Sequence, residues 1–127
     1  MSRGVLDTSV LVATDVRPLP GELAISVVSL AELHYGVLVA KSSEARATRL
    51  SRLARLQKRF DPLPVDQAVA DIYGRLAART VDAGRRPRGR VMDLLIAATA
   101  HAHGAILYTR NPDDLRGLGD LVEVVAV

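Results

Sequence analysis

Several acidic side chains in this sequence stand at the boundaries of apolar segments, where few structural roles require a charge. Asp7 follows a short apolar run, Asp93 begins the apolar stretch MDLLIAATAHAHGAILYT, and Glu32 lies within SVVSLAELHYGV. Asp113 and Asp114 come shortly after the end of that apolar stretch. Carboxylates that gather in one place repel one another unless protons or a cation compensate their charge. The acids therefore predict a cation site, provided that the fold brings them together.

The available ligands favour Mg²⁺ at such a site, with Mn²⁺ as a substitute. The chain has no cysteine, so a thiolate site is excluded. His101 and His103 are two residues apart on a predicted helix and cannot share one face. We interpret them, and His34, as structural. Hard oxygen ligands suit Mg²⁺ and Mn²⁺, and such an ion can activate a water and neutralise charge on a phosphate that is being cleaved.

Each acid also has a simpler structural explanation. Glu32 stands three residues after Ser29, which is the spacing of a capping box. Asp93 would interact favourably with the dipole of a helix that begins beside it. Asp113 and Asp114 fall in a predicted surface turn. The functional interpretation therefore depends on the whole set of acids rather than on any one of them.

Short apolar segments alternate with longer helical patterns along the chain. Strands are predicted at residues 3–7, 23–28, 63–65, 105–109 and 121–127. Helices are predicted at 10–13 (capped by Thr8 and Ser9), 29–40, 43–60, 66–83 and 91–103, with a turn at 111–115. This alternation predicts an α/β domain with a mostly parallel, covered sheet. Ligands bind such sheets beyond the carboxyl ends of the strands, where the strand order reverses.

Length and composition exclude only a few classes of protein. A length of 127 residues predicts one domain, and no apolar run is long enough to cross a membrane. The absence of cysteine fits a reducing cytoplasm, and no signal peptide is evident, although secretion is not excluded. A net charge of +3 is compatible with a polyanionic partner, while an aromatic content of 3% argues against a broad base-stacking platform.

Four sequence blocks, taken in order, resemble a known family. They are LDTSV (6–10), SVVSLAELHYGV (26–37), MDLLIAATAHAHG (92–104) and LYTRNPDDL (107–115). They look like the motif blocks of PIN-domain ribonucleases, and most of all of the VapC toxins of bacterial toxin–antitoxin pairs. The resemblance implies a single PIN domain over residues 1–127, with a mostly parallel five-stranded sheet and helices on both faces.

The resemblance also implies roles for particular residues. The catalytic, metal-binding acids would be Asp7, Glu32, Asp93 and Asp114, with Asp113 as a substitute for the last. The supporting polar residues would be Thr8, Ser9, Thr109 and Asn111, which orient ligands by hydrogen bonding. The implied activity is Mg²⁺-dependent hydrolysis of phosphodiester bonds in structured RNA, commonly transfer RNA. The implied partners are a VapB-type antitoxin that covers the site and a second copy of the chain in a homodimer.

Two groups of basic residues have alternative interpretations. Arg85, Arg86, Arg88 and Arg90 precede Asp93 and would either contact RNA phosphates or form a solvated loop. The arginines between residues 46 and 59 are expected to form a solvated helix face, or a rim that meets an antitoxin, rather than an RNA groove.

Two other functions share some of these sequence features. A response-receiver domain also combines carboxylates with Mg²⁺, and the predicted third strand does lead to Asp66, where such a domain has its phosphoacceptor Asp. It also needs an acid pair after its first strand and a lysine after its last, and this chain has neither. A PIN-like module that binds RNA or protein without cleaving stays open as the alternative, because the identity of the fourth acid is ambiguous.

Overall fold

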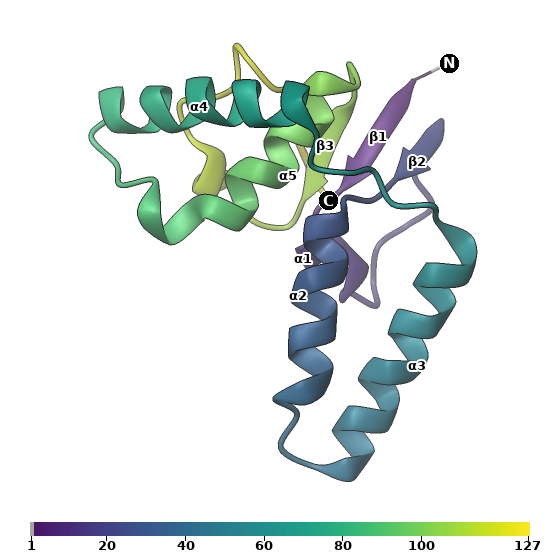
Figure 1. The fold of residues 1–127 in the computed structure, drawn as a ribbon. Helices are drawn as coiled ribbons and strands as arrows, with labels where there is room; N and C mark the ends of the chain where they lie inside the picture. Colours follow the sequence, from purple (N-terminus) through teal and green to yellow (C-terminus); the bar gives the residue numbers. More distant parts are fainter. Residues whose placement is uncertain (1) are drawn as a thin grey trace.

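The computed structural model describes residues 2–127 and contains one parallel sheet of four strands. The strands are β1 (Arg3–Leu6), β2 (Glu22–Ala24), β3 (Ile106–Thr109) and β4 (Val124–Ala126), in the spatial order β2-β1-β3-β4. From β1 the chain first moves outward to β2 and later returns to place β3 on the other side (Figure 1). The strand order therefore reverses between β1 and β3, which is where this architecture forms ligand sites.

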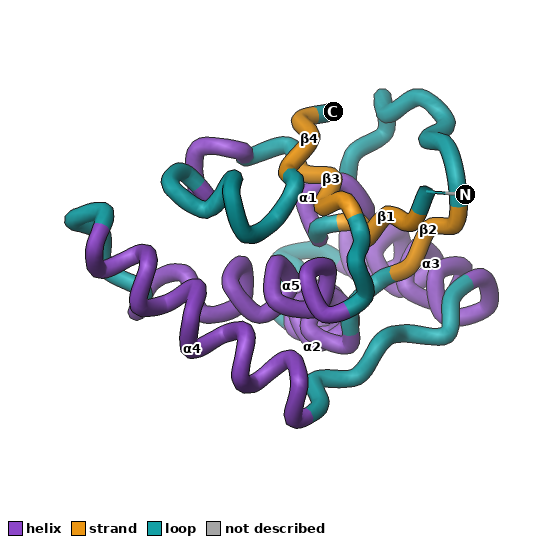
Figure 2. Tube along the Cα trace, turned by 90° about the horizontal axis from the view of Figure 1, so that it is seen from above, coloured by secondary structure: helices purple, strands orange, loops and turns teal. Residues whose placement is uncertain are grey.

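Helices cover both faces of the sheet, as expected. Helices α4 (Gln67–Asp82) and α5 (Val91–Ala102) pack against each other on one side of it (Figure 2). Val5 and Leu107 of the sheet join Leu76 and Leu94 of these helices in the larger core cluster. The opposite face is covered by the short helix α1 (Thr8–Leu11) and the loop that follows it, and Leu6, Val10 and Tyr108 form the core there.

Helices α2 (Val27–Leu38) and α3 (Ser43–Arg59) form an arm that extends away from the sheet (Figure 1). Leu33, Val37 and Leu53 are buried between the two helices. Arg49 Nη1 also donates to the carbonyl oxygen of Gly36 at 2.6 Å, which ties α3 to α2. We call this pair the α2–α3 arm. None of the helices in the described part of the chain has the length and apolar character needed to cross a membrane.

The expectation of five strands was wrong, because the segment at 63–65 makes only an isolated bridge. Leu63 N donates to the Ile25 carbonyl at 2.8 Å, and the Leu63 carbonyl accepts from Val27 N at 3.0 Å. Pro62 and Pro64 flank this residue, and proline has no N–H to continue a ladder. The last strand is likewise confined to Val124–Ala126 rather than 121–127.

The start of α1 differs from the prediction that Thr8 and Ser9 cap it. Asp7 is the N-cap, and its Oδ1 accepts a hydrogen bond from Thr8 N at 2.9 Å. A carboxylate suits this position because it can accept from the unpaired N–H groups at a helix start. The acid at the end of β1 therefore also begins the next helix.

The start of α2 was also mispredicted, and this changes the position of Glu32. Ser26, not Ser29, is the N-cap, and its hydroxyl oxygen accepts from Val28 N at 3.0 Å. The N-cap lies three residues earlier than predicted, so Glu32 lies beyond the first turn of the helix and no capping box forms. The simpler explanation of Glu32 as a capping residue is thereby removed.

Candidate active site at the carboxyl edge of the sheet

The carboxylate of Asp7 is held by a chain of hydrogen bonds at the point where β1 and β3 end. Ser9 Oγ and Thr109 Oγ1 each donate to Asp7 Oδ2 at 2.8 Å. Both hydroxyl oxygens accept in turn from backbone N–H groups, those of Arg110 and Asn111, at 3.0 Å. Because an ionised carboxylate can only accept, the hydrogen of each hydroxyl is directed toward Asp7. The orientation of this buried carboxylate is therefore fixed by its surroundings.

Asp93 reaches the same place from the first turn of α5. A narrow hollow is lined by Asp7, Asp93, Leu107, Thr109, Asn111, Asp114 and Leu115, and we call it the acid hollow. Burial, followed by the charges of Asp7, Asp114 and Glu32, raises the pKa of Asp93 from 3.8 to about 6, and the charge of Arg90 opposes this rise. Burial and the neighbouring negative charges therefore disfavour the ionised form of Asp93 when no cation is bound.

Glu32 lies at the edge of this group rather than inside it. Its Oε1 is 2.6 Å from Thr8 Oγ1, which donates to it. The same hydroxyl lies 2.9 Å from Oγ of Ser29, a fully buried side chain of α2. Glu32 does not line the acid hollow, but its charge is near enough to act on Asp93. Thr8 therefore orients Glu32 beside the other acids.

The two neighbouring acids of the turn η2 (Pro112–Leu115) have different surroundings. Asp114 lines the acid hollow, and its Oδ1 lies 3.2 Å from Arg90 Nη1. Asp113 does not line the hollow, and its 86% exposed side chain pairs with Arg116 at 3.3 Å. Asn111 takes part through its backbone N–H. The geometry therefore favours Asp114 over Asp113 as the fourth acid.

The oxygen ligands of the acid hollow suit a divalent cation, although the carboxylates do not converge on one point. Residues 2–127 contain no group of three or more acidic or histidine side chains that could hold an ion as they stand. Thr8 donates to Glu32, and Arg90 pairs with Asp114. What remains is an all-oxygen donor set with uncompensated negative charge at Asp93, which suits Mg²⁺ or Mn²⁺.

The family model of the PIN domain matches residues 4–120. The chain belongs to the PIN-domain family. Among curated proteins, ribonuclease VapC5 of Mycobacterium tuberculosis is 40% identical over 116 residues, which covers 87% of this chain and 84% of that protein. Ribonuclease VapC4 of the same species is 37% identical over 131 residues, which covers 98% and 97%. The resemblance inferred from the four sequence blocks is confirmed, and this PIN domain is of the VapC type.

A solved structure agrees with this assignment. The crystal structure of VapBC-5 from Mycobacterium tuberculosis, a member of the VapBC family of toxin–antitoxin systems, contains a chain that superposes on this PIN domain with a TM-score of 0.85. The two chains are 38% identical, and the match covers 100% of this chain and 98% of the other. The predicted α/β fold is confirmed, with the number of strands corrected.

The basic loop before Asp93 divides into two kinds of arginine. Arg85 and Arg90 donate to the carbonyl oxygens of two successive η2 residues, at 2.8 and 3.0 Å. Arg86 and Arg88 are exposed, and neither makes an ion pair or a side-chain hydrogen bond with the residues that the structure describes. Arg85 and Arg90 thus hold the loop against η2, whereas Arg86 and Arg88 face solvent.

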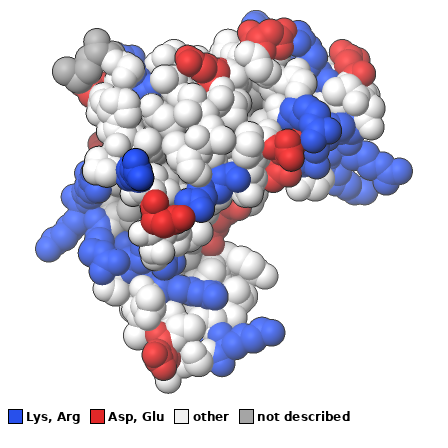
Figure 3. Space-filling view, turned by 180° about the vertical axis from the view of Figure 1, so that it is seen from behind, with Lys and Arg blue, Asp and Glu red and all other residues white. Residues whose placement is uncertain are grey.

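A second basic element borders the site on the α2–α3 arm. Arg49 and Arg52 line a groove of about 290 Å³ together with Thr8 and Glu32. The sequence predicted only a solvated face or an antitoxin rim for these arginines, because their position beside Glu32 depends on how α3 packs against α2. Figure 3 shows Lys and Arg side chains on the arm and at the opposite corner of the same face, with acidic side chains recessed between them.

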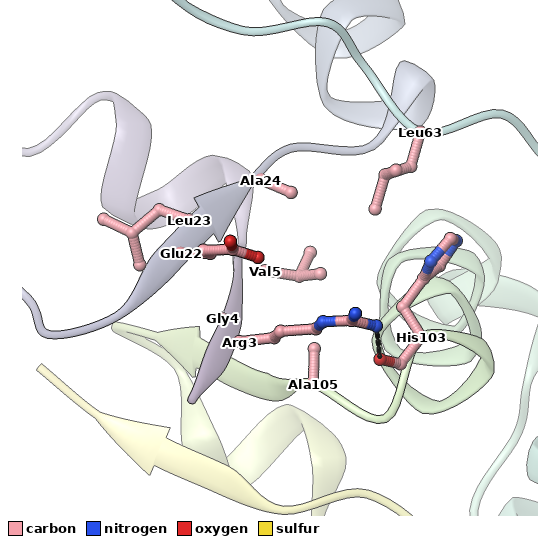
Figure 4. Close-up of a pocket in the computed structure, with 9 residues that line it drawn as sticks. All are labelled: Arg3, Gly4, Val5, Glu22, Leu23, Ala24, Leu63, His103 and Ala105. Atoms are coloured by element: carbon pink, nitrogen blue, oxygen red, sulfur yellow. Dashed lines mark hydrogen bonds between the residues drawn. The ribbon is translucent and has the colours of Figure 1, made fainter. Parts of the chain in front are cut away.

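The opposite end of the sheet has different chemistry. A cavity of about 200 Å³ there is lined by Arg3, Glu22, His103 and apolar side chains (Figure 4). Arg3 Nη1 donates to the His103 carbonyl at 3.5 Å, and His101 Nδ1 lies 2.5 Å from the Leu121 carbonyl oxygen. A helix rises about 1.5 Å per residue, so His103 lies about 15 Å along the helix from Asp93. Neither of these two histidines is placed to join the acids.

Proposed function

We propose that this VapC-type PIN domain is a Mg²⁺-dependent endoribonuclease, with Mn²⁺ as a substitute ion, and that it is the toxin of a toxin–antitoxin pair. Its substrate would be structured RNA, transfer RNA in particular. The observation that carries the proposal is the convergence of Asp7 and Asp93 at the carboxyl edge of the sheet, between β1 and β3. The similarity to two proteins named ribonucleases supports the choice of substrate.

The proposed mechanism assigns the ion to Asp7, Glu32 and Asp93, with Asp114 completing the set of acids. When bound, a divalent ion lowers the pKa of a water and offsets the charge that develops on a phosphodiester during in-line attack. The protein prepares the donors for this task. Ser9 and Thr109 hold the Asp7 carboxylate in one orientation, and Thr8 does the same for Glu32. Such supporting hydrogen bonds commonly matter nearly as much as the ligands.

Basic side chains on both sides of the acids would bind the RNA backbone. Arg86 and Arg88 are free to contact phosphates on one side, and Arg49 and Arg52 line the groove on the other. Neutralising several phosphates gives much of the affinity of proteins for nucleic acid. A net charge of +3 agrees with this role.

Exposed apolar side chains support a protein partner. Four large ones lie on the outer part of the α2–α3 arm: Tyr35 (67% exposed), Leu38 (72%), Val39 (47%) and Leu50 (54%). Exposed apolar side chains can contribute to interaction sites when they adjoin one another. We propose a VapB-type antitoxin as the partner, since the related VapBC-5 structure is of a toxin–antitoxin family member. A homodimer is also expected.

The test is cleavage of total RNA by purified, antitoxin-free protein. Wild type is compared with Asp93→Asn, and with Asp113→Asn as a matched control on an exposed acid outside the acid hollow. Discrete fragments are expected from wild type and Asp113→Asn in Mg²⁺, and none from Asp93→Asn or in chelator. Sequencing of the fragment ends then identifies the RNA. Intact RNA from folded wild type would favour the non-cleaving binding module instead.

A further inference from the structure

Arg90 places a fixed positive charge against the acid hollow. Its Nη1 donates to the backbone carbonyl of Asp114 at 3.0 Å and lies 3.2 Å from Oδ1 of the same residue. The Arg90 side chain is only 25% exposed, compared with 73% for Arg116 in the neighbouring pair with Asp113. The contact thus differs from an ordinary surface ion pair in being both partly buried and held at two points.

The charge of Arg90 also reaches the centre of the site. It acts on Asp93 in opposition to the charges of Asp7, Asp114 and Glu32. A guanidinium remains protonated at any pH that a folded protein experiences. Arg90 therefore remains a cation beside these acids whether or not a metal ion is bound.

We propose that Arg90 is a positioning residue that holds Asp114 and supplies the positive charge that a second metal ion would otherwise bring, so that the site binds a single divalent ion. The inference rests on the proposed function, because it requires the acids to bind a divalent ion. It adds to the proposed function the number of metal ions that the site binds and the residue that limits this number.

The geometry gives the physical reason. A second ion on Asp114 would share a carboxylate whose Oδ1 already lies 3.2 Å from the guanidinium. A second ion bound to this carboxylate would lie close to the guanidinium. Two cations that share one partly buried carboxylate repel each other strongly. The carbonyl contact at 3.0 Å further restrains the side chain of Arg90. Within residues 2–127, neither Asp7 nor Asp93 forms an ion pair of this kind, and we assign them to the metal ion.

Arg85 supplies a matched control. It fastens the same loop to η2 through the carbonyl of Asp113 at 2.8 Å, but it touches no carboxylate of the site. Removing Arg85 therefore loosens the same two segments without removing the charge beside Asp114. Arg90→Lys keeps a cation at the position and serves as the conservative variant.

The test is isothermal titration of chelator-treated protein with MnCl₂, for wild type, Arg90→Gln, Arg90→Lys, Arg85→Gln and Asp93→Asn. One Mn²⁺ per chain is expected for wild type, Arg90→Lys and Arg85→Gln, and two for Arg90→Gln. Adding Asp114→Asn to Arg90→Gln should remove the second ion. Binding to Asp93→Asn should be at least about tenfold weaker, because one of the charged ligands is lost.

The outcomes separate this inference from the function on which it rests. Two ions on wild type, or one ion of unchanged affinity on Arg90→Gln, would overturn the role of Arg90 and leave the metal-dependent function intact. No ion on wild type would overturn the metal-dependent function, and the inference with it. Two ions on wild type would overturn the proposal even if Arg90→Gln does not fold.

Discussion

Thr109 Oγ1 donates to Asp7 Oδ2 at 2.8 Å, although 102 residues separate the two in the sequence. The register of the sheet explains their meeting. Leu6 of β1 pairs with Tyr108 of β3, and Asp7 N donates to the Tyr108 carbonyl at 2.9 Å. The residues that follow these two parallel strands must therefore lie side by side. The central contact of the site is thus a direct consequence of strand pairing.

Thr109→Val should weaken both stability and activity. The substitution keeps the shape of this fully buried side chain but removes the donor to Asp7 and the acceptor of Asn111 N. Leaving buried polar groups unpaired costs about 1–3 kcal/mol, which urea unfolding in chelator would measure. Cleavage should fall by about tenfold to a hundredfold, as for other groups that orient metal ligands. Thr109→Ser keeps the hydroxyl, and an equal loss in that variant would contradict this explanation.

The stability of the ion-free protein should depend on pH through Asp93. Its pKa of about 6 in the folded chain exceeds the ordinary 3.8, because burial and neighbouring carboxylates disfavour the charged form. Between these values the folded chain keeps a proton that the unfolded chain has lost, so stability falls as pH rises through this window. Above this pH window, the full free-energy cost of ionising Asp93 in the folded chain remains.

Asp93→Asn removes this penalty and isolates its contribution. In chelator, the variant should gain about 1 kcal/mol on wild type between pH 4 and pH 7, a figure reduced for the solvent screening of a half-buried group. The measurement is urea unfolding of both proteins at several pH values within this range. Parallel profiles for the two proteins would show that Asp93 titrates normally.

Much of the site could be predicted from strand ends alone. Asp7 and Thr109 each close an apolar run, and parallel strands bring such positions to one edge of the sheet. Asp93 begins a helix that packs on the same sheet, and the structure places it in the same hollow. The α/β class follows from the same alternation of segments, because it depends only on local patterns.

The contacts that distinguish one acid from another could not be predicted. The position of Glu32 within α2 depends on Ser26 capping this helix, whereas the cap was predicted at Ser29. The pairing of Arg90 with Asp114 depends on how the loop before α5 packs on η2, which no local pattern encodes. The failed strand at 63–65 is a different case, since the prolines on both sides of Leu63 already argued against it.

Thr8→Val should weaken metal binding without disturbing Asp7. The Thr8 hydroxyl donates to Glu32 Oε1 at 2.6 Å, whereas the Thr8 backbone N–H, which valine retains, donates to Asp7 Oδ1. The affinity for Mn²⁺ should fall by about tenfold to a hundredfold because Glu32 loses its fixed orientation. Titration calorimetry would measure this, with Thr8→Ser as the control. Unchanged affinity in Thr8→Val would mean that Glu32 does not contribute to the ion site.

Arg86 and Arg88 should account for part of the salt dependence of RNA binding. Each is exposed at the loop beside the acid hollow, and each phosphate contact contributes about 0.7–0.9 to the slope of log affinity against log salt. Arg86→Gln and Arg88→Gln should each lower the slope by about that amount, measured by RNA binding to the Asp93→Asn protein. Arg75→Gln removes an equal charge from an exposed pair with Asp71 on α4 and should leave the slope unchanged. Equal effects in all three variants would instead indicate that RNA responds only to net charge.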